Sequence, residues 1–162
     1  MESSEILINI RKIVRSINLE SKRIQKEYGV SIPQLLALQH LKNGEGRQST
    51  HKEIMKLLAL NSSTVTGILN RLEKKGYLAR LAKGSDKRVS IIGLTSKGEA
   101  LLDKSPLLLH EKLEQRLQEL SGSQFDEIKN ALTKLVSILG IEQMDASPMI
   151  TMEEPITPKD SE

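Results

Sequence analysis

The sequence predicts a mainly α fold with a small β-hairpin wing, that is, a winged helix-turn-helix with further helices at its N- and C-terminal ends. Two observations carry this prediction. First, four segments between residues 5 and 76 show apolar residues at helical spacing, and the third and fourth are short and closely joined. Second, residues 78–93 switch to short, partly β-branched runs split by a polar turn, after which helical spacing returns.

The first two helices are predicted from isoleucine spacing and from capping residues. Residues 5–28 carry isoleucines at helical spacing. The next helix begins after Ser31, which can form a capping box with Gln34 three residues later, and it ends at Gly44. Residues 44–49, GEGRQS, are expected to form a polar loop.

The third and fourth helices form the helix-turn-helix. Thr50 and Glu53 make a second capping box at the start of a short helix. A tight turn at residues 59–60 leads to a helix that begins near Asn61 and ends at Gly76, for which we expect a left-handed conformation. The apolar positions of this pair, which form a buried face in the second helix, are Ile54, Leu57, Leu58, Val65, Ile68, Leu69 and Leu72.

Two helices are predicted after the wing. The first is capped by Thr95 or Ser96, with Ser96 and Glu99 as a third capping box, and it reaches about residue 120 with a kink or break at Pro106. The second starts in SGSQ, residues 121–124, and ends at Gly140. The remaining residues, 141–162, contain prolines, carry net negative charge and show no periodicity, so this tail is expected to be disordered.

The net charge of +3 is unevenly distributed. The tail at 141–162 carries −5, so residues 1–140 carry +8. Residues 47–97 hold eleven Lys or Arg against three acidic residues, which is again +8. Concentrated positive charge is expected of a surface that meets phosphate, although an ordinary solvated basic surface would have the same composition.

Composition excludes several classes of function. The chain has no Cys, which removes disulfides, thiolate metal sites, a cysteine nucleophile and a cysteine peroxide sensor, and fits a reducing cytoplasm. No apolar run is long enough to span a membrane, and the N-terminus does not resemble a signal peptide. The three His lack metal-ligand spacing, and His51 is expected to contact phosphate instead. No catalytic or cofactor-binding motif is recognised, so we expect neither an enzyme nor a cofactor.

The helix that begins near Asn61 carries small polar residues where longer side chains would stabilise a helix better. The face opposite its apolar residues has no acidic residue. Capping explains one such residue, whereas hydroxyls and amides over several turns suit base edges and phosphate oxygens in a DNA groove. The residues of this helix predicted to contact DNA are Ser62, Ser63, Thr66, Asn70, Arg71 and Lys74.

The segment that follows is predicted to be a two-stranded hairpin with arms at about 78–82 and 88–93 and with Arg80 on the first arm. A basic loop beside such a helix can reach the adjacent minor groove, where an inserted Arg meets strong negative potential. The alternative is that the tip of this hairpin is only an exposed charged turn with no role in DNA binding. Asp86 is expected to orient Arg88 or to cap the turn. The hairpin residues predicted to contact DNA are Lys83, Asp86, Lys87 and Arg88.

Four motifs, in this order and spacing, make the sequence similar to the MarR family of bacterial and archaeal transcription factors. They are STVT at 63–66, LEKKGY at 72–77, DKR at 86–88 and LTSKG at 94–98. The similarity covers about residues 5–140 and leaves the tail outside.

The resemblance implies an assembly and a mode of binding. It implies a homodimer formed by helices at about 5–28 and 96–140, with a DNA-binding lobe at about 47–97. It also implies a pseudo-palindromic operator in double-stranded DNA, with the helix after Asn61 in successive major grooves and Arg88 in the minor groove. Many members release DNA on binding a small-molecule effector, often an aromatic carboxylate. This chain has only three aromatic residues, so its effector is expected to be non-aromatic or absent.

The leading interpretation is therefore a sequence-specific transcriptional regulator that acts in the cytoplasm as a repressor. An architectural or weakly specific DNA-binding protein is one alternative, and the hydroxyls and amides of the fourth helix argue against it, since non-specific binding needs mainly Lys and Arg. A winged-helix protein-interaction module is the other, and it predicts binding that is insensitive to salt.

Overall fold

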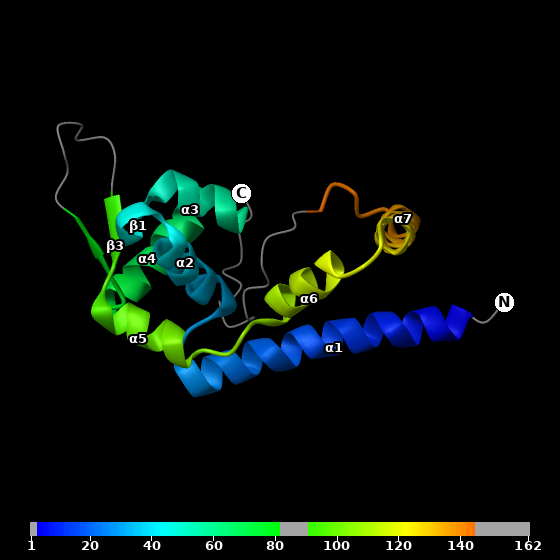
Figure 1. Cartoon of the computed structure of the whole chain (residues 1–162), viewed down its shortest axis with the longest axis horizontal. Helices are drawn as coiled ribbons and strands as arrows, with labels where there is room; N and C mark the ends of the chain where they lie inside the picture. Colours follow the sequence, from blue (N-terminus) through cyan, green and yellow to red (C-terminus); the bar gives the residue numbers. More distant parts are fainter. Residues whose placement is uncertain (1–2, 82–90, 145–162) are drawn as a thin grey trace, which may run out of the picture. The chain divides into compact units, whose positions relative to one another are not determined.

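The computed structural model describes residues 3–81 and 91–144, and over these ranges the chain is mainly helical with one small antiparallel sheet (Figure 1). This confirms the predicted fold class of a winged helix-turn-helix with further helices at both ends. The helices are α1 (Ser3–Tyr28), α2 (Ile32–Asn43), α3 (His51–Leu58), α4 (Ser62–Lys74), α5 (Ser96–Lys104), α6 (Leu109–Gln118) and α7 (Gly122–Leu139). The strands are β1 (Gln48–Thr50), β2 (Leu78–Arg80) and β3 (Ile91–Leu94), preceded by a 3-10 turn at Glu45–Arg47.

The described residues form two compact units. The first contains residues 3–81 and 91–105, with α1 to α5 and the sheet, and the second contains residues 106–144, with α6 and α7. Helix α5 thus groups with the helix-turn-helix, although its sequence position suggested a grouping with the helices that run to residue 140. The dimerisation role of the terminal helices stays a prediction.

Local capping sets the boundaries of α1 and α2 as predicted. Gly29 directly follows α1 and takes a positive φ of 68°. The Ser31 hydroxyl accepts a hydrogen bond from the backbone N–H of Gln34, and the Gln34 side chain accepts one from the N–H of Ser31. Gly44 ends α2 and donates its N–H to carbonyls of the last turn.

Capping also places the two helices of the helix-turn-helix. The predicted box between Thr50 and Glu53 is present at the start of α3. The tight turn after α3 uses Ala59 in a left-handed conformation, with φ of 50°. At the end of α4, Gly76 has φ of 78°, and the Tyr77 N–H donates to the Leu72 carbonyl at 3.0 Å. This six-residue closure is a Schellman motif, and it confirms the left-handed Gly76.

The core of the first unit consists of aliphatic side chains. The predicted buried face of α4 is confirmed, because Val65, Ile68, Leu69 and Leu72 are each 2% exposed or less. Turning this face to solvent would cost about 6–12 kcal/mol at roughly 1.5–3 kcal/mol per side chain, so burial decides which side of α4 is exposed. In α3, Ile54 and Leu58 are buried, whereas Leu57 is 48% exposed.

The segment predicted as a polar loop contains a strand. Gln48–Thr50 forms β1, which pairs antiparallel with β3, and β3 pairs with β2, so the sheet has three strands in the order β1-β3-β2. The prediction of a loop was wrong because a three-residue polar strand has no local signal and its partner lies far along the chain. The arms of the wing are described at Leu78–Arg80 and Ile91–Leu94, and residues 82–90 lie outside the described residues.

The predicted helix after the wing is interrupted at Pro106, where a kink or break was expected: a break separates α5 from α6 there. Thr95 caps α5 by accepting a hydrogen bond from the N–H three residues later. The predicted capping box of Ser96 with Glu99 is wrong, since Ser96 is already the first helical residue. The Glu99 carboxylate instead pairs with the Arg47 guanidinium of the 3-10 turn.

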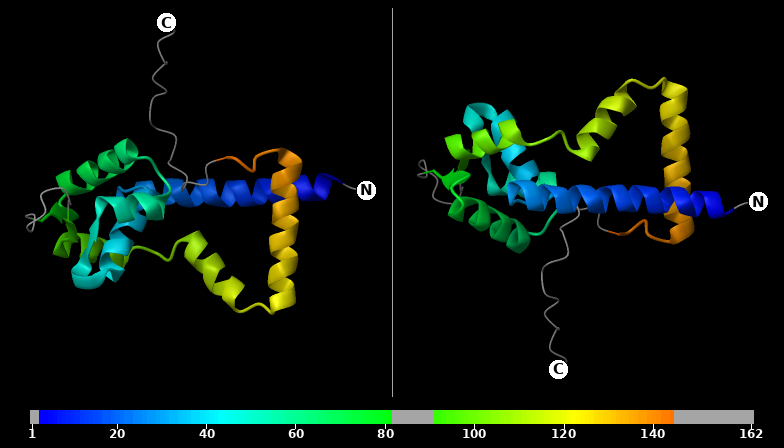
Figure 2. Two further views of the ribbon diagram at one scale, coloured as in Figure 1. Left: turned by 90° about the horizontal axis from the view of Figure 1, so that it is seen from above. Right: turned by 90° about the horizontal axis from the view of Figure 1, so that it is seen from below.

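In the second unit, α6 and α7 run in different directions and are joined by a short turn (Figure 2). The start of α7 in SGSQ is confirmed, with Ser121 as its N-cap, and so is its end at Gly140, which has φ of 65°. Neither α6 nor α7 contains a buried residue. From residue 145 onward, the tail predicted to be disordered lies outside the described residues.

Candidate DNA-binding surface

The first turn of α4 is organised by the Asn61 side chain. Its Oδ1 accepts hydrogen bonds from the Thr64 backbone N–H at 2.9 Å and from the Ser63 hydroxyl at 2.7 Å. Asn61 is therefore the N-cap, and the Ser63 oxygen is held in place with lone pairs that can still accept. No acidic residue lies in this turn, so the positive end of the helix has no carboxylate of its own.

Thr66 connects α4 to the start of α3. The Thr66 hydroxyl donates to the Ser62 carbonyl at 2.8 Å, and Nε2 of His51 lies 3.1 Å from the same hydroxyl oxygen. Because the carbonyl uses the single hydroxyl proton, His51 Nε2 is the donor in the second bond. The pairing fixes one exposed position of α4 against α3, and no local pattern in the sequence would have revealed it.

All six residues predicted on α4 lie on its exposed face. Each of them is exposed, whereas the opposite face is buried in the core. They are Ser62, Ser63, Thr66, Asn70, Arg71 and Lys74. The structure brings this set together on one side of one helix, and their contact with DNA stays a prediction.

An arginine from the wing meets α4 at its last exposed turns. Arg80 on β2 donates from Nη2 to Asn70 Oδ1 at 2.5 Å, and its Nε lies 3.7 Å from Glu73 Oε2. Asn70 and Glu73 are three residues apart, so both contacts fall on neighbouring positions of the helix surface. Arg80 was not among the residues predicted to contact DNA, because its position depends on β2 passing beside α4.

The hairpin residues predicted to contact DNA lie outside the described residues; they are Lys83, Asp86, Lys87 and Arg88. The base of the wing is described. Arg80 is paired with Ile92 across β2 and β3, and the Leu81 N–H donates to the Ile91 carbonyl at 2.9 Å. The base of the wing therefore lies beside α4, where Arg80 contacts Asn70.

A chain of hydrogen bonds supports the start of α3. One oxygen of the Glu53 carboxylate accepts from the Thr50 N–H at 2.8 Å, from the Ser49 hydroxyl at 2.8 Å and from the Thr50 hydroxyl at 3.0 Å. These bonds hold the pKa of Glu53 below its usual value, the Thr50 backbone bond having the largest effect. The Ser49 hydroxyl also lies 2.9 Å from Nε2 of His40. These hydrogen bonds link α2, β1 and α3 and fix the start of α3.

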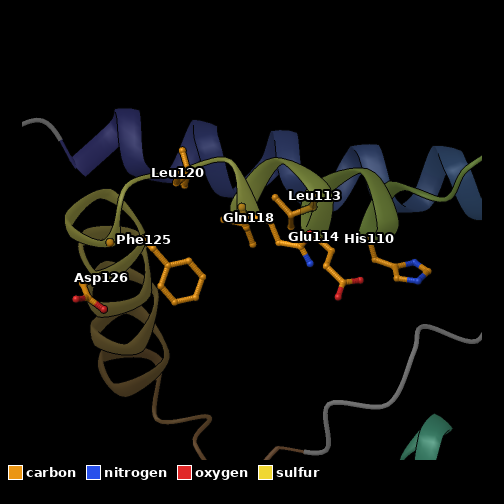
Figure 3. Close-up of a pocket in the computed structure, with 9 residues that line it drawn as sticks. His110, Leu113, Glu114, Gln118, Leu120, Phe125 and Asp126 are labelled. Carbon is orange, nitrogen blue, oxygen red and sulfur yellow. The ribbon is translucent and has the colours of Figure 1, made fainter.

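The second unit has an open groove between α6 and the start of α7 (Figure 3). Its apolar side chains are Leu113, Leu117, Leu120 and Phe125, and its polar side chains include His110, Glu114, Gln118 and Asp126. Leu113 is 56% and Phe125 is 43% exposed, so this apolar surface is not buried within the second unit as far as that unit is described.

Neither a metal centre nor a membrane span is found in the part of the chain that the structure describes. Over 3–81 and 91–144, no group of three or more His, Cys, Asp or Glu could hold a metal ion. None of the described helices combines the length and the hydropathy needed to cross a membrane.

Comparisons with known proteins agree with this geometry. Residues 20–105 match the family model described as transcriptional regulator SarA/Rot. The organic hydroperoxide resistance transcriptional regulator of Bacillus subtilis is 30% identical over 125 residues, which cover 77% of this chain and 82% of the relative. The transcriptional repressor MprA of Escherichia coli is 27% identical over 123 residues, covering 76% of this chain and 70% of MprA.

Solved structures show the same fold. MepR of S. aureus in its DNA-binding conformation superposes with a TM-score of 0.61 at 25% identity, covering 83% of this chain and 98% of MepR. The family model spans more than half of the chain, and the Bacillus relative is matched over most of its length. Together with the helix-turn-helix and its wing, these similarities show that the chain belongs to the MarR family of winged-helix transcriptional regulators.

Proposed function

We propose that the chain is a homodimeric, sequence-specific repressor that binds a pseudo-palindromic site in double-stranded DNA with α4 in the major groove. The observation that carries this proposal is the exposed face of α4, where six polar or basic residues lie opposite a buried apolar face. Short hydroxyl and amide side chains let a helix approach base edges closely. Arg71 and Lys74, further along the same face, add the positive charge that phosphates attract.

The wing is proposed as the second contact. Lys83, Lys87 and Arg88 would follow the phosphates into the adjacent minor groove, with Asp86 as the partner that orients Arg88. The position of the wing's base supports this assignment, because Arg80 at the end of β2 already contacts α4.

Homodimerisation is supported by apolar side chains that stay exposed in each unit. On α1 they include Ile6, Leu7, Ile13, Val14 and Leu19, and on α7 they include Phe125, Ile128, Leu132, Val136 and Leu139. Since α6 and α7 contain no buried residue, they need a partner surface to be stable as helices. The proposed partner is a second copy of the chain, and the groove in Figure 3 belongs to the surface that it covers.

The proposal assigns residues 47–97 to DNA binding, 5–28 and 96–140 to dimerisation, and 141–162 to an acidic tail outside both. Repression is proposed from the similarity to MprA, whose name describes a transcriptional repressor, and the cytoplasm is the proposed location. A small-molecule effector that releases DNA is part of the family resemblance. With only three aromatic residues in the chain, we expect its effector to be non-aromatic or absent.

Selection of genomic DNA fragments by the purified full-length protein, at two salt concentrations, tests the proposal. Enrichment of one palindromic site with steep salt dependence is the expected result, because phosphate contacts release counterions. Salt-sensitive binding without a preferred site would replace the proposal with an architectural protein. Absence of binding at both salt concentrations would favour a protein-interaction module.

A further inference from the structure

We propose that Arg80 determines sequence specificity: together with Asn70 it forms a pair of hydrogen-bond donors that selects guanine in the major groove. This inference rests on the proposed function of α4 and names the base that one of its residues reads. Arg80 comes from β2 rather than from α4, so the wing and the helix would read this base together.

The guanidinium of Arg80 is held against α4 by two contacts. Its Nη2 donates to Asn70 Oδ1 at 2.5 Å, and its Nε lies 3.7 Å from Glu73 Oε2. The Arg80 and Glu73 side chains are 42% and 39% exposed, so the pair is partly withdrawn from water but still accessible to DNA. Two contacts to residues three positions apart fix the guanidinium at the surface of the helix.

The contact determines which way the Asn70 amide faces. A guanidinium has donors only, so the amide must turn its oxygen toward Arg80, and its NH2 group then points away. An Asn side chain reads adenine with both groups, its oxygen accepting from N6–H and its nitrogen donating to N7. Because the Arg80 guanidinium already donates to the Asn70 amide oxygen, the N6–H of adenine or the N4–H of cytosine would compete with a positive donor for that oxygen. The NH2 group of Asn70 remains able to donate.

The pair therefore offers donors and favours a base with acceptors. Arg80 has N–H groups beyond those that face Asn70 and Glu73, since a guanidinium carries five. Guanine presents two acceptors in the major groove, N7 and O6, whereas adenine presents one acceptor beside a donor and thymine presents one acceptor. A donor from Asn70 beside a donor from Arg80 matches guanine.

The test compares full-length wild type with Arg80→Met, which keeps the aliphatic stem and removes all donors. The preferred site is first selected from random DNA with wild type, and affinities are then measured for all four base pairs at each position. Asn70→Ala identifies the base pair that depends on Asn70, and we expect guanine there. Arg80→Met should lower the preference for guanine at that same pair by about tenfold and raise the relative preference for adenine, because the amide oxygen is released.

Two further variants separate specificity from charge. Lys42→Met removes an exposed cation outside residues 47–97 that is also ion-paired, in this case with Asp103, and it should leave the base preference unchanged. Glu73→Gln removes the carboxylate that helps to hold Arg80, and it should weaken the guanine preference at the same base pair by less than Arg80→Met does. An unchanged preference in Glu73→Gln and Arg80→Met would show that the contact has no role in readout.

The inference and the proposed function fail in different ways. If wild type selects a site but prefers adenine at the Asn70-dependent pair, or if Arg80→Met weakens binding to all four base pairs equally, then Arg80 contacts phosphate and the inference is overturned. If wild type selects no site at all, the proposed sequence-specific function is itself wrong, and the inference falls with it.

Discussion

At the residue scale, the exposed polar side chains of α4 are held in position within the protein. Ser63 donates to the capping amide of Asn61, Thr66 accepts from His51, and Asn70 accepts from an arginine of β2. Side chains that are already ordered lose less conformational entropy when a partner binds. This preorganisation suits a surface that distinguishes one DNA sequence from another.

Replacing Asn70 by Ala should lower the affinity for the selected site by about 1–3 kcal/mol, the usual contribution of a side chain that reads a base. Affinity for random DNA should stay close to wild type, because the change removes no charge. Fluorescence anisotropy with both DNAs measures the ratio. Asn130→Ala, which removes an exposed amide from α7, is the matched control. An unchanged ratio of specific to random affinity would remove Asn70 from the readout set.

The carboxylate of Glu53 should make stability depend on pH. Its pKa in the folded state is lowered from the ordinary 4.5, chiefly by the Thr50 backbone bond, so the ionised carboxylate stabilises the fold above that pH. This stabilisation is lost as the pH falls through the lowered pKa. Glu53→Gln keeps an oxygen for the Thr50 N–H but has no charge to lose.

Wild type should therefore be more stable than Glu53→Gln at about pH 7, and the difference should shrink as the pH is lowered from there through the lowered pKa of Glu53. Urea unfolding of both proteins across this range measures it. Glu127→Gln, in which an exposed carboxylate of α7 outside any capping box is replaced, controls for the general change in charge. A wild-type advantage that is independent of pH would contradict the role assigned to the carboxylate.

At the scale of elements, the start of α5 packs on the end of α4 and satisfies its last backbone groups. The Thr95 hydroxyl donates to the Gly76 carbonyl at 2.6 Å, and Lys97 Nζ donates to the Lys75 carbonyl at 2.7 Å. Lys97 Nζ also lies 5.1 Å from the centre of the Tyr77 ring. The orientation of α4 therefore depends on how closely α5 can approach.

Gly98 permits this approach, because a Cβ at this position would lie 2.1 Å from the Tyr77 carbonyl oxygen. Gly98→Ala should push α5 away and destabilise the protein by about 1–3 kcal/mol, as overpacking does. Thermal unfolding measures the loss. A Cβ added at Gly122 would have no heavy atom within 4 Å, so Gly122→Ala should be neutral or slightly stabilising. Equal stabilities of the two variants would show that α5 does not need the glycine.

The wing is expected to act mainly through charge. Arg88→Ala should weaken DNA binding and reduce the slope of log affinity against log salt by about 1, as the loss of one phosphate contact does. Titrations at several salt concentrations give the slope. Lys104→Ala removes a cation from the end of α5 and should leave the slope unchanged. If the salt dependence of Arg88→Ala has the same slope as that of wild type, Arg88 does not contact a DNA phosphate.

At the scale of the whole molecule, charge and exposed apolar surface lie in different segments. The excess positive charge lies in residues 47–97, which contain the helix-turn-helix and the wing. Rows of exposed apolar side chains lie instead on α1 and α7. Such rows rarely stay open to water on a stable monomer, and they favour association with another surface.

Leu132→Glu should convert the proposed dimer into a monomer at micromolar concentration, because it places a charge in the apolar row of α7, where Leu132 is 52% exposed. Sedimentation velocity measures the change. Thr133→Glu places the same charge on the neighbouring exposed position and should leave the dimer intact. If both variants sediment as wild type does, the α7 row does not form the interface.

Much of the fold could be predicted because its signals are local. Capping at Ser31 and Thr50 and the left-handed Gly76 depend on residues a few positions apart, and the buried face of α4 depends on helical spacing alone. The exposed set on α4 followed from the same spacing. The predicted loop at 44–49 and the Ser96 capping box failed because long-range strand pairing and the exact start of a helix are not encoded in spacing alone.

The sequence by itself determined the order of the helices, the class of the fold and the face of α4 that is polar, since each depends on periodicity and on short-range hydrogen bonds. Only the tertiary structure decided that β1 joins the sheet, that His51 holds Thr66 and that Arg80 reaches Asn70. These contacts join segments that are separated along the chain and brought together by burial of the core. Burial is set by all the packed elements at once, so no short stretch of sequence specifies such a contact.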